Sequence, residues 1–185
     1  MNRFKQCFTM AFAIAIMNVS IAQEKTVDVG GAAMYPSKNI VENALNSKDH
    51  TTLVAAVKAA GLVETLQGSG PFTVFAPTNS AFEKLPAGTV DNLLKPENKE
   101  VLAGVLTYHV VPGKLDSKET GSLLKAGNGK AELTTAEGGK LWLWMKDDKL
   151  MIKDEKGGAA MVTIKDVYQS NGVIHVIDGV VLPQD

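Results

Sequence analysis

The sequence has almost no cysteine. Its one cysteine, Cys7, lies close to the N-terminus, so no intramolecular disulfide can hold the fold together and the rest of the chain has no thiol for catalysis. Long apolar runs are missing as well. The longest, residues 7–17, is shorter than the about 20 residues that a membrane-spanning helix needs. We therefore predict a domain without disulfides and without a membrane span.

A charge excess of one sign is also missing. The chain has 19 basic and 20 acidic side chains, with a formal net charge of −1. Its densest group of lysines, in residues 146–156, is interleaved with acidic residues, which is typical of a solvated hairpin or loop edge. Because a nucleic-acid backbone is bound by a basic patch, we expect no nucleic-acid partner.

Motifs that would indicate catalysis are absent too. No Gly-x-Ser-x-Gly turn occurs, and the Gly-Ser-Gly-Pro of residues 68–71 precedes an expected strand, whereas a phosphate-binding loop opens a helix. The acidic pairs at 147–148 and 154–155 do not follow the ligand pattern of a calcium loop, and no two histidines have zinc-site spacing. We predict no catalytic residue, no metal site and no cofactor. The enzymatic alternative is a hydrolase that uses carboxylates without a recognisable motif.

The first 22 residues have the pattern of a secretory signal sequence. Arg3 and Lys5 form a basic start, the apolar segment follows, and Ser-Ile-Ala at 20–22 is a cleavage site of the small-x-small type. Cleavage there would make Gln23 the first residue. We expect export to the periplasm or the extracellular space, as for a secreted bacterial protein with a single domain.

The remaining chain divides into a spacer and one domain. Residues 23–36 contain few large apolar side chains and are expected to form a flexible spacer outside the core. In residues 37–185 apolar positions recur first at helical spacing, with Ser37 and Asp49 as expected helix starts, and later at strand spacing. The expected helices are 40–45, 49–60, 62–66, 90–94 and 97–106, and the expected strands are 72–76, 130–135, 140–146, 149–153, 161–164 and 173–177. Helices that precede strands in this way predict a single α+β domain.

Three segments carry a more specific pattern. Residues 73–82 read Thr-Val-Phe-Ala-Pro-Thr-Asn-Ser-Ala-Phe, which predicts a strand ended by proline and a helix capped by Thr78, Asn79 or Ser80. Residues 108–113 read Tyr-His-Val-Val-Pro-Gly. Residues 171–183 read Asn-Gly-Val-Ile-His-Val-Ile-Asp-Gly-Val-Val-Leu-Pro.

In order and wording, these segments resemble the fasciclin-like domain (FAS1, or beta-Ig-H3) over roughly residues 37–183. The resemblance implies a FAS1-like fold, with early helices packed against a mainly antiparallel β-sheet wedge, and structural roles for the residues of the three segments. That set comprises Thr73, Phe75, Pro77, Thr78, Asn79, Phe82, Tyr108, His109, Gly172, His175, Asp178 and Pro183.

The three histidines are interpreted separately. His50 lies in polar sequence at an expected helix start and is predicted to be exposed. His175 lies on a strand that is apolar on both faces, so its ring nitrogens need partners, and Tyr108 or His109 are expected to supply them. The resemblance implies that this Tyr-His pair is a structural hydrogen-bonding element.

Two tryptophans are candidates for binding a partner. Trp142 and Trp144 share one face of an expected strand, opposite Leu141 and Leu143. If the leucines face the core, the indoles form an exposed platform that could bind sugars or proteins. In the alternative arrangement the indoles pack under a helix.

Asp166 and Val167 form the second candidate for binding a partner. They stand where animal matrix proteins that contain FAS1-like domains have an Asp-Ile pair linked to integrin binding. The alternative is that Asp166 only ends a strand at a turn.

The resemblance and the missing catalytic motifs together favour an exported, non-catalytic adhesion or binding module. Its expected partner is a protein or an extracellular matrix polysaccharide. The alternatives are a small-ligand-binding or stress-related envelope protein and the carboxylate-dependent hydrolase.

Overall fold

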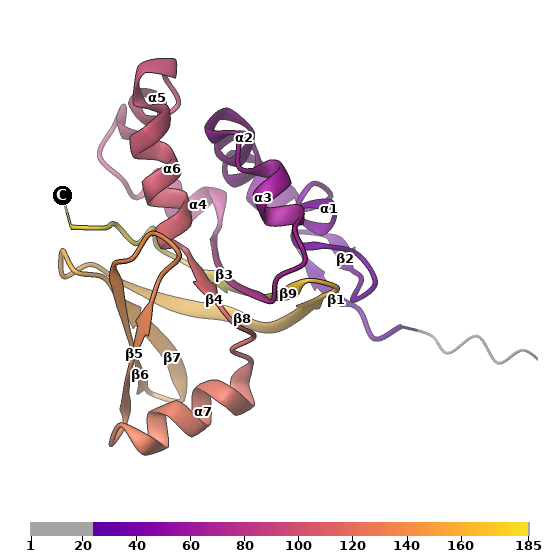
Figure 1. Ribbon diagram of the computed structural model, residues 1–185, viewed down its shortest axis with the longest axis vertical. Coiled ribbons are helices and arrows are strands. Elements are labelled where there is room, and N and C mark those ends of the chain that lie inside the picture. Colours follow the sequence, from indigo (N-terminus) through magenta and orange to yellow (C-terminus); the bar gives the residue numbers. More distant parts are fainter. Residues whose placement is uncertain (1–23, 185) are drawn as a thin grey trace, which may run out of the picture.

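The computed structural model describes residues 24–184, so the expected signal sequence lies outside the described residues. Figure 1 shows a bent sheet between two helical parts, with α1 to α6 at one end of the molecule and α7 alone at the other. The combination of helices and a mainly antiparallel sheet confirms the predicted α+β class.

A seven-stranded sheet runs through the molecule in the order β4-β3-β9-β8-β7-β6-β5. Only the pair β3 with β9 is parallel in this sheet, and the remaining neighbours are antiparallel. The strands are β3 (Phe72–Pro77), β4 (Val110–Pro112), β5 (Lys130–Thr134), β6 (Lys140–Lys146), β7 (Lys149–Lys153), β8 (Ala159–Gln169) and β9 (Gly172–Ile177).

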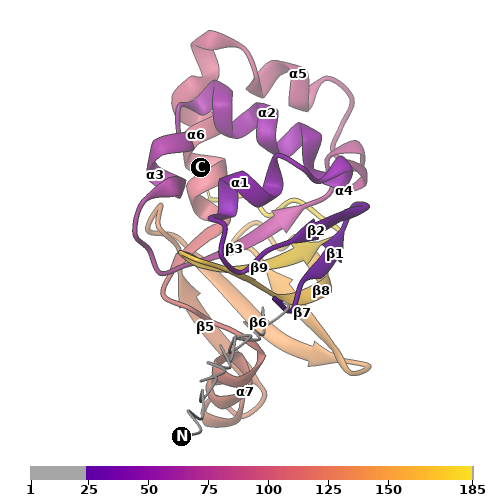
Figure 2. The same cartoon turned by 90° about the vertical axis from the view of Figure 1, so that its right-hand side faces the viewer.

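β9 is an interior strand, as predicted. It lies between β3 and β8, and all six of its residues are buried. β8 is long enough to pair with β9 at one end and with β7 at the other, and its register against β9 shifts twice, between Val162 and Val167. Such bulges increase local twist. The sheet therefore turns, and the β5–β7 part faces away from the helical layer (Figures 1 and 2).

The helices of the larger layer begin and end at residues that satisfy their free backbone groups. Asn39 caps α1: its side chain accepts from the Glu42 amide while the Glu42 carboxylate accepts from the Asn39 amide. Ser37, the expected cap, is not used. Gly61 ends α2 with a φ of 73°. The helices are α1 (Ile40–Ala44), α2 (Thr51–Ala60), α3 (Val63–Gln67), α4 (Asn79–Glu83), α5 (Thr89–Leu93) and α6 (Lys99–Tyr108), with 3₁₀ turns η1 (Lys48–His50) and η2 (Pro96–Asn98).

One helix, α7 (Ser117–Ala126), has no counterpart in the predicted elements. Asp116 caps it, with one carboxylate oxygen accepting from the amides of Lys118 and Glu119. Few of its residues are apolar, and Leu124 is the one that is buried. The helical periodicity is therefore weak in sequence.

Two apolar clusters form the interior. The first lies between the larger helical layer and β3, β8 and β9 and includes Leu53, Val57, Leu106 and Ile174. The second lies between α7 and the β5–β7 part and includes Leu124, Leu141, Leu143 and Ile152.

The prediction of a spacer outside the core is wrong for residues 27–34. They form a hairpin of β1 (Val27–Val29) and β2 (Ala32–Met34), turned by Gly30 and Gly31 with φ of 63° and 73°. Val29 and Met34 are 2% and 3% exposed and belong to the first apolar cluster. Two apolar side chains of the hairpin are sufficient to join the core because β2 packs against α1 and β8.

Candidate functional site

His175 is held in the sheet by two backbone partners. Its Nδ1 accepts from the Asp166 amide at 3.4 Å, so its Nε2 carries the proton and donates to the Leu115 carbonyl at 2.7 Å. The ring stacks on Phe75 with 5.7 Å between the centroids. Burial lowers the pKa of His175, so the ring is neutral at pH 7. The expected partners Tyr108 and His109 are not its partners.

His109 is the C-cap of α6 and directly follows its last residue. Its Nδ1 donates to the Val105 carbonyl at 2.8 Å, and its Nε2 accepts from the Val181 amide at 3.2 Å. Burial lowers its pKa to about 4. This imidazole therefore links α6 to the C-terminal segment in its neutral form.

Tyr108 makes the corresponding link on the other side of the same helix end. Its hydroxyl donates to the Lys140 carbonyl at 2.5 Å and accepts from the Glu155 amide at 3.2 Å. Burial raises the pKa of Tyr108 to about 12, so the phenol keeps its proton. The Tyr-His pair thus connects α6 to both the β6–β7 region and the C-terminal segment.

His50 is buried, and the prediction that it is exposed is wrong. It is 3% exposed, and its Nδ1 lies 2.9 Å from the Ser47 hydroxyl. Within residues 24–184 its Nε2 has no hydrogen-bond partner. Burial lowers its pKa. The polar sequence around His50 does not reveal this because the cover comes from the distant β1–β2 hairpin, which packs on residues 47–50 at Gly30.

The two signature segments also serve the scaffold. Thr73 accepts from the Leu115 amide and donates to the Gly113 carbonyl, Thr78 caps α4, and Asn79 accepts from the Thr52 amide. Pro77 is the last residue of β3, and Phe75 is 1% exposed. Gly172 lies so close to β3 that a Cβ there would be 2.0 Å from the Phe72 carbonyl oxygen. Asp178 accepts from the Met161 amide and pairs with Lys84 at 3.5 Å, while Phe82 and Pro183 are half-buried.

Asp166 and Val167 do not present an acid beside an exposed apolar anchor. Val167 is 1% exposed and belongs to the first apolar cluster. Asp166 has a φ of 59° at the bulge of β8, and its two carboxylate oxygens accept from the amide and the hydroxyl of Ser117. Its carboxylate thus holds the start of α7.

The tryptophans lie on the outer face of β6. Leu141 and Leu143 are fully buried in the cluster that α7 covers, whereas Trp142 and Trp144 are half-buried on the opposite face. Of the two predicted arrangements, the structure thus has the one with the leucines inside. The Trp142 Nε1 donates to the Glu132 carboxylate at 3.2 Å, which holds this indole in place.

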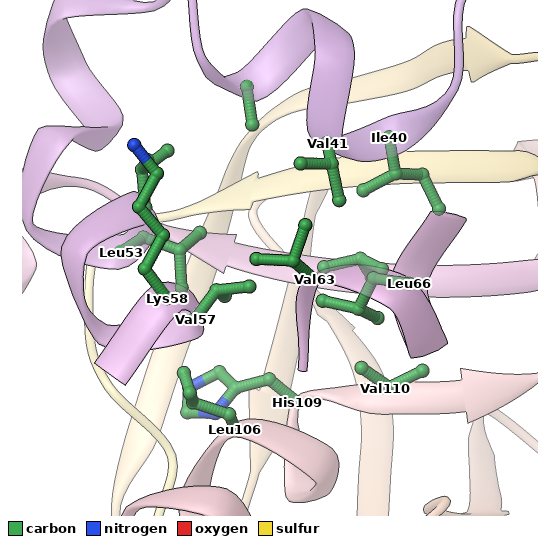
Figure 3. Close-up of a pocket in the computed structure, with 13 residues that line it drawn as sticks. Ile40, Val41, Leu53, Val57, Lys58, Val63, Leu66, Leu106, His109 and Val110 are labelled. Carbon is green, nitrogen blue, oxygen red and sulfur yellow. The ribbon is translucent and has the colours of Figure 1, made fainter. Parts of the chain in front are cut away.

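An apolar cavity lies inside the larger helical layer. Figure 3 shows it between Ile40 and Val41 on one side and Leu106, His109 and Val110 on the other. Its volume of about 40 Å³ is well below the roughly 300 Å³ of the smaller ligand pockets. As it stands, it accommodates no organic ligand.

Between residues 24 and 184, no three His, Cys, Asp or Glu side chains are grouped so that they could hold a metal ion. Over the same residues, no helix is both long and apolar enough to cross a bilayer.

Sequence comparisons place the chain among known proteins. It matches the model of the Fasciclin domain over residues 48–183. It is 47% identical over 176 residues to Protein sll1483 of Synechocystis sp., which covers 93% of this chain and 91% of that protein. It is 36% identical over 145 residues to immunogenic protein MPB70 of Mycobacterium bovis, covering 76% and 66% of the two chains. It is 35% identical to transforming growth factor-beta-induced protein ig-h3 of Sus scrofa, covering 80% of this chain and 20% of that protein.

The structural comparison agrees on the fold. A FAS1 domain pair from the insect cell adhesion molecule Fasciclin I aligns with a TM-score of 0.69 at 18% identity, covering 80% of this chain and 52% of that one. The family match spans well over half of the chain and includes the segments whose residues form the scaffold described above. The chain therefore belongs to the fasciclin (FAS1) domain family.

Proposed function

We propose that this protein is an exported FAS1 module that acts by binding and not by catalysis, and that its partner is a protein or a matrix polymer. The observation that carries the proposal is that the buried polar side chains and the outward-facing aromatic side chains have different surroundings. The buried side chains of Tyr108, His109, Asp154 and His175 bind the protein's own backbone, and the two indoles face outward.

The buried groups support a scaffold role one by one. His109 and Tyr108 each bond backbone groups of other segments, and Asp154, which is 2% exposed, accepts from the amides of Gly158 and Leu182. A general acid or base must reach the proton that it transfers. These groups are already occupied inside the fold, so they are poorly placed for such a transfer.

The family relationship supports the same proposal. FAS1 domains occur in adhesion proteins, and the structural neighbour comes from a cell adhesion molecule. A small ligand enclosed in the core has less support because the apolar cavity there is too small for an organic ligand. Export rests on the signal-like pattern of residues 1–22.

The test is a capture experiment with the exported protein purified from its producing cells. Its N-terminal residue is determined first, and Gln23 is the expected result. The immobilised protein is then exposed to envelope extract and to arrays of glycans and matrix proteins. Saturable capture of a partner by folded protein, but not by heat-unfolded protein, is the expected outcome. Turnover of a polymer that is lost on substitution of one carboxylate would contradict the proposal.

A further inference from the structure

We propose that the outer face of β5, β6 and β7 is a binding groove for an acidic polysaccharide, a chain built from sugars that carry carboxylates. The inference rests on the proposed function and names the partner class and the surface. We call this surface the indole face and define it by Trp142, Trp144, Met151, Lys130 and Lys153.

The strand register brings these side chains together from three strands. Lys130, Trp144 and Met151 face one another across β5, β6 and β7, and Met161 of β8 continues the row. Glu132, Trp142 and Lys153 form the adjacent row. Neighbouring strands are about 4.8 Å apart, so each indole has a lysine within one or two strands.

The indole face is hollowed. A groove of about 620 Å³ is lined by both indoles, Lys130, Lys153 and the turn at residues 154–157. That turn is fixed, since Asp154 is buried and its two carboxylate oxygens accept from the amides of Gly158 and Leu182 at 2.6 and 2.9 Å. The volume is within the range of about 300–1,000 Å³ that is usual for ligand sites. A concave, fixed surface suits an inserted chain better than a flat bilayer.

The charge on this face is positive although the whole chain is slightly acidic. Five exposed lysines point outward from β5, β6 and β7 against one strand carboxylate, Glu132. Glu132 pairs with Lys140 at 2.8 Å, and within residues 24–184 no ion pair occupies the other four. Asp147 and Asp148 join Lys146 to Lys149 in the β6–β7 turn and offset the charge of that pair. The positive excess therefore lies at the groove, which Lys130, Lys153 and Lys156 line together with Glu155. The five are Lys130, Lys140, Lys146, Lys149 and Lys153.

The chemistry of the two rows fits a sugar acid. An indole presents a negative ring face, against which the weakly positive C–H groups of a pyranose can lie. Two residues along a strand separate the indoles by about 7 Å, so two successive rings of a chain can each contact one of them. Lysine ammonium groups would pair with the carboxylates. Glu132, held by Trp142 and Lys140, can accept from sugar hydroxyls.

Other occupants fit less well. If a second copy of the chain bound through the same face, its five lysines would lie against the five lysines of the first copy, and the like charges would repel. A nucleic acid is usually read and held with arginine, and the described residues contain none. An acidic peptide would satisfy the lysines but lacks flat rings for both indoles.

The test uses fluorescence, because the chain's two tryptophans both lie in the groove. The exported protein is titrated with oligogalacturonate and oligoalginate, with neutral cello-oligosaccharide, an oligoglutamate peptide and single-stranded DNA as comparisons. We expect a saturable change in tryptophan emission with one or both uronate chains, weakened by salt. The double exchange Lys130→Glu with Lys153→Glu should weaken this binding about tenfold or more.

A matched control makes the same change in charge elsewhere. Lys99→Glu with Lys118→Glu alters two exposed lysines in the first turns of α6 and α7, where a carboxylate is compatible with the helix dipole. Its affinity for the uronate chain should stay within about twofold of the parent, since both sites lie off the sheet face. Trp144→Phe, which keeps a ring, should retain part of the affinity that Trp144→Ala loses.

Several results would overturn the inference. They are no uronate binding, equal binding by the Lys130/Lys153 variant, equal binding of the neutral chain, and tighter binding of the peptide or DNA. If a partner is captured from envelope extract with equal efficiency by the Lys130/Lys153 variant, the inference fails while the proposed function stands. If folded protein captures no partner, the proposed function fails as well.

Discussion

At the scale of single residues, the domain uses neutral buried side chains to join segments that are distant in sequence. Asn171 is a further case: its side-chain amide donates to the Leu66 and Gly68 carbonyls and accepts from the Ile40 amide. His109 and His175 do the same with their two ring nitrogens. In each case a single side chain forms hydrogen bonds with buried backbone groups that would otherwise have no partner. Each backbone group left without a partner would lower the stability of the fold by about 1–3 kcal/mol.

The buried histidines make stability depend on pH. The pKa of His109 is about 4 in the folded state and 6.5 when exposed, so the unfolded chain binds more protons between these values. The stabilisation is complete above pH 6.5 and is lost as pH falls toward 4, by about 3 kcal/mol for this residue. We expect the free energy of unfolding, measured by denaturant titration, to fall between pH 7 and pH 4.5.

The variant His109→Gln separates this effect from titration of the carboxylates. Glutamine has one donor and one acceptor but no titratable group. The slope of its unfolding free energy against pH should be smaller than that of the parent. The difference should correspond to nearly one fewer proton bound on unfolding between the two pKa values of His109. A pH slope equal to that of the parent would contradict the assigned role of His109.

At the scale of secondary-structure elements, the β1–β2 hairpin is part of the folding unit. It packs on residues 47–49 beside His50 and contributes Val29 and Met34 to the first apolar cluster. The family match begins only at residue 48, so the hairpin lies before the matched region and yet packs on it.

Substitution in the hairpin tests this role. Met34→Ala removes a buried side chain and should lower the free energy of unfolding by about 2–5 kcal/mol. Tyr35→Ala, at the next position and 40% exposed, is the control and should change stability by less than about 1 kcal/mol. Thermal and denaturant unfolding measure both. Equal small effects would show that the hairpin does not contribute to the core in solution.

How far the elements follow from sequence differs along the chain. β6 and β7 have the predicted bounds because each is an apolar run with a lysine at either end, and a two-residue turn at Asp147 and Asp148 separates them. α7 and the hairpin are missed, since one has few apolar residues and the other has strands of three residues. Whether such short segments form a helix or a strand depends on their tertiary packing.

The candidate site follows from sequence only in part. Alternation shows that Trp142 and Trp144 share a face, but which face is buried depends on where α7 packs. Lys130 and Lys153 meet the indoles only through strand pairing, so local sequence shows mixed charge and hides the positive face. For the same reason the partners of His175 lie in segments that no motif links to it.

At the scale of the whole molecule, the two apolar clusters share one sheet. β8 pairs with β9 beside the first cluster and with β7 beside the second, and the Tyr108-His109 pair ties α6 to both the β6–β7 region and the C-terminal segment. Loss of either cluster removes support from the other. The domain should therefore unfold as a single unit.

Two spectroscopic signals can test that cooperativity. Tryptophan emission reports on β6, beside the second cluster, and far-ultraviolet circular dichroism reports mainly on the helices, most of which pack on the first. We expect denaturant midpoints that coincide within error. Midpoints that differ clearly would show that the two parts of the sheet unfold separately.

The described ends of the chain lie on opposite sides of the fold, with β1 entering at one side of Figure 1 and the C-terminal segment leaving at the other. Copies joined head to tail by short linkers would therefore extend as a line, without folding back on one another. Each unit would repeat its groove along that line. A long polymer that is held weakly by one unit would be held far more tightly by such an array, because each further contact forms at a high effective concentration.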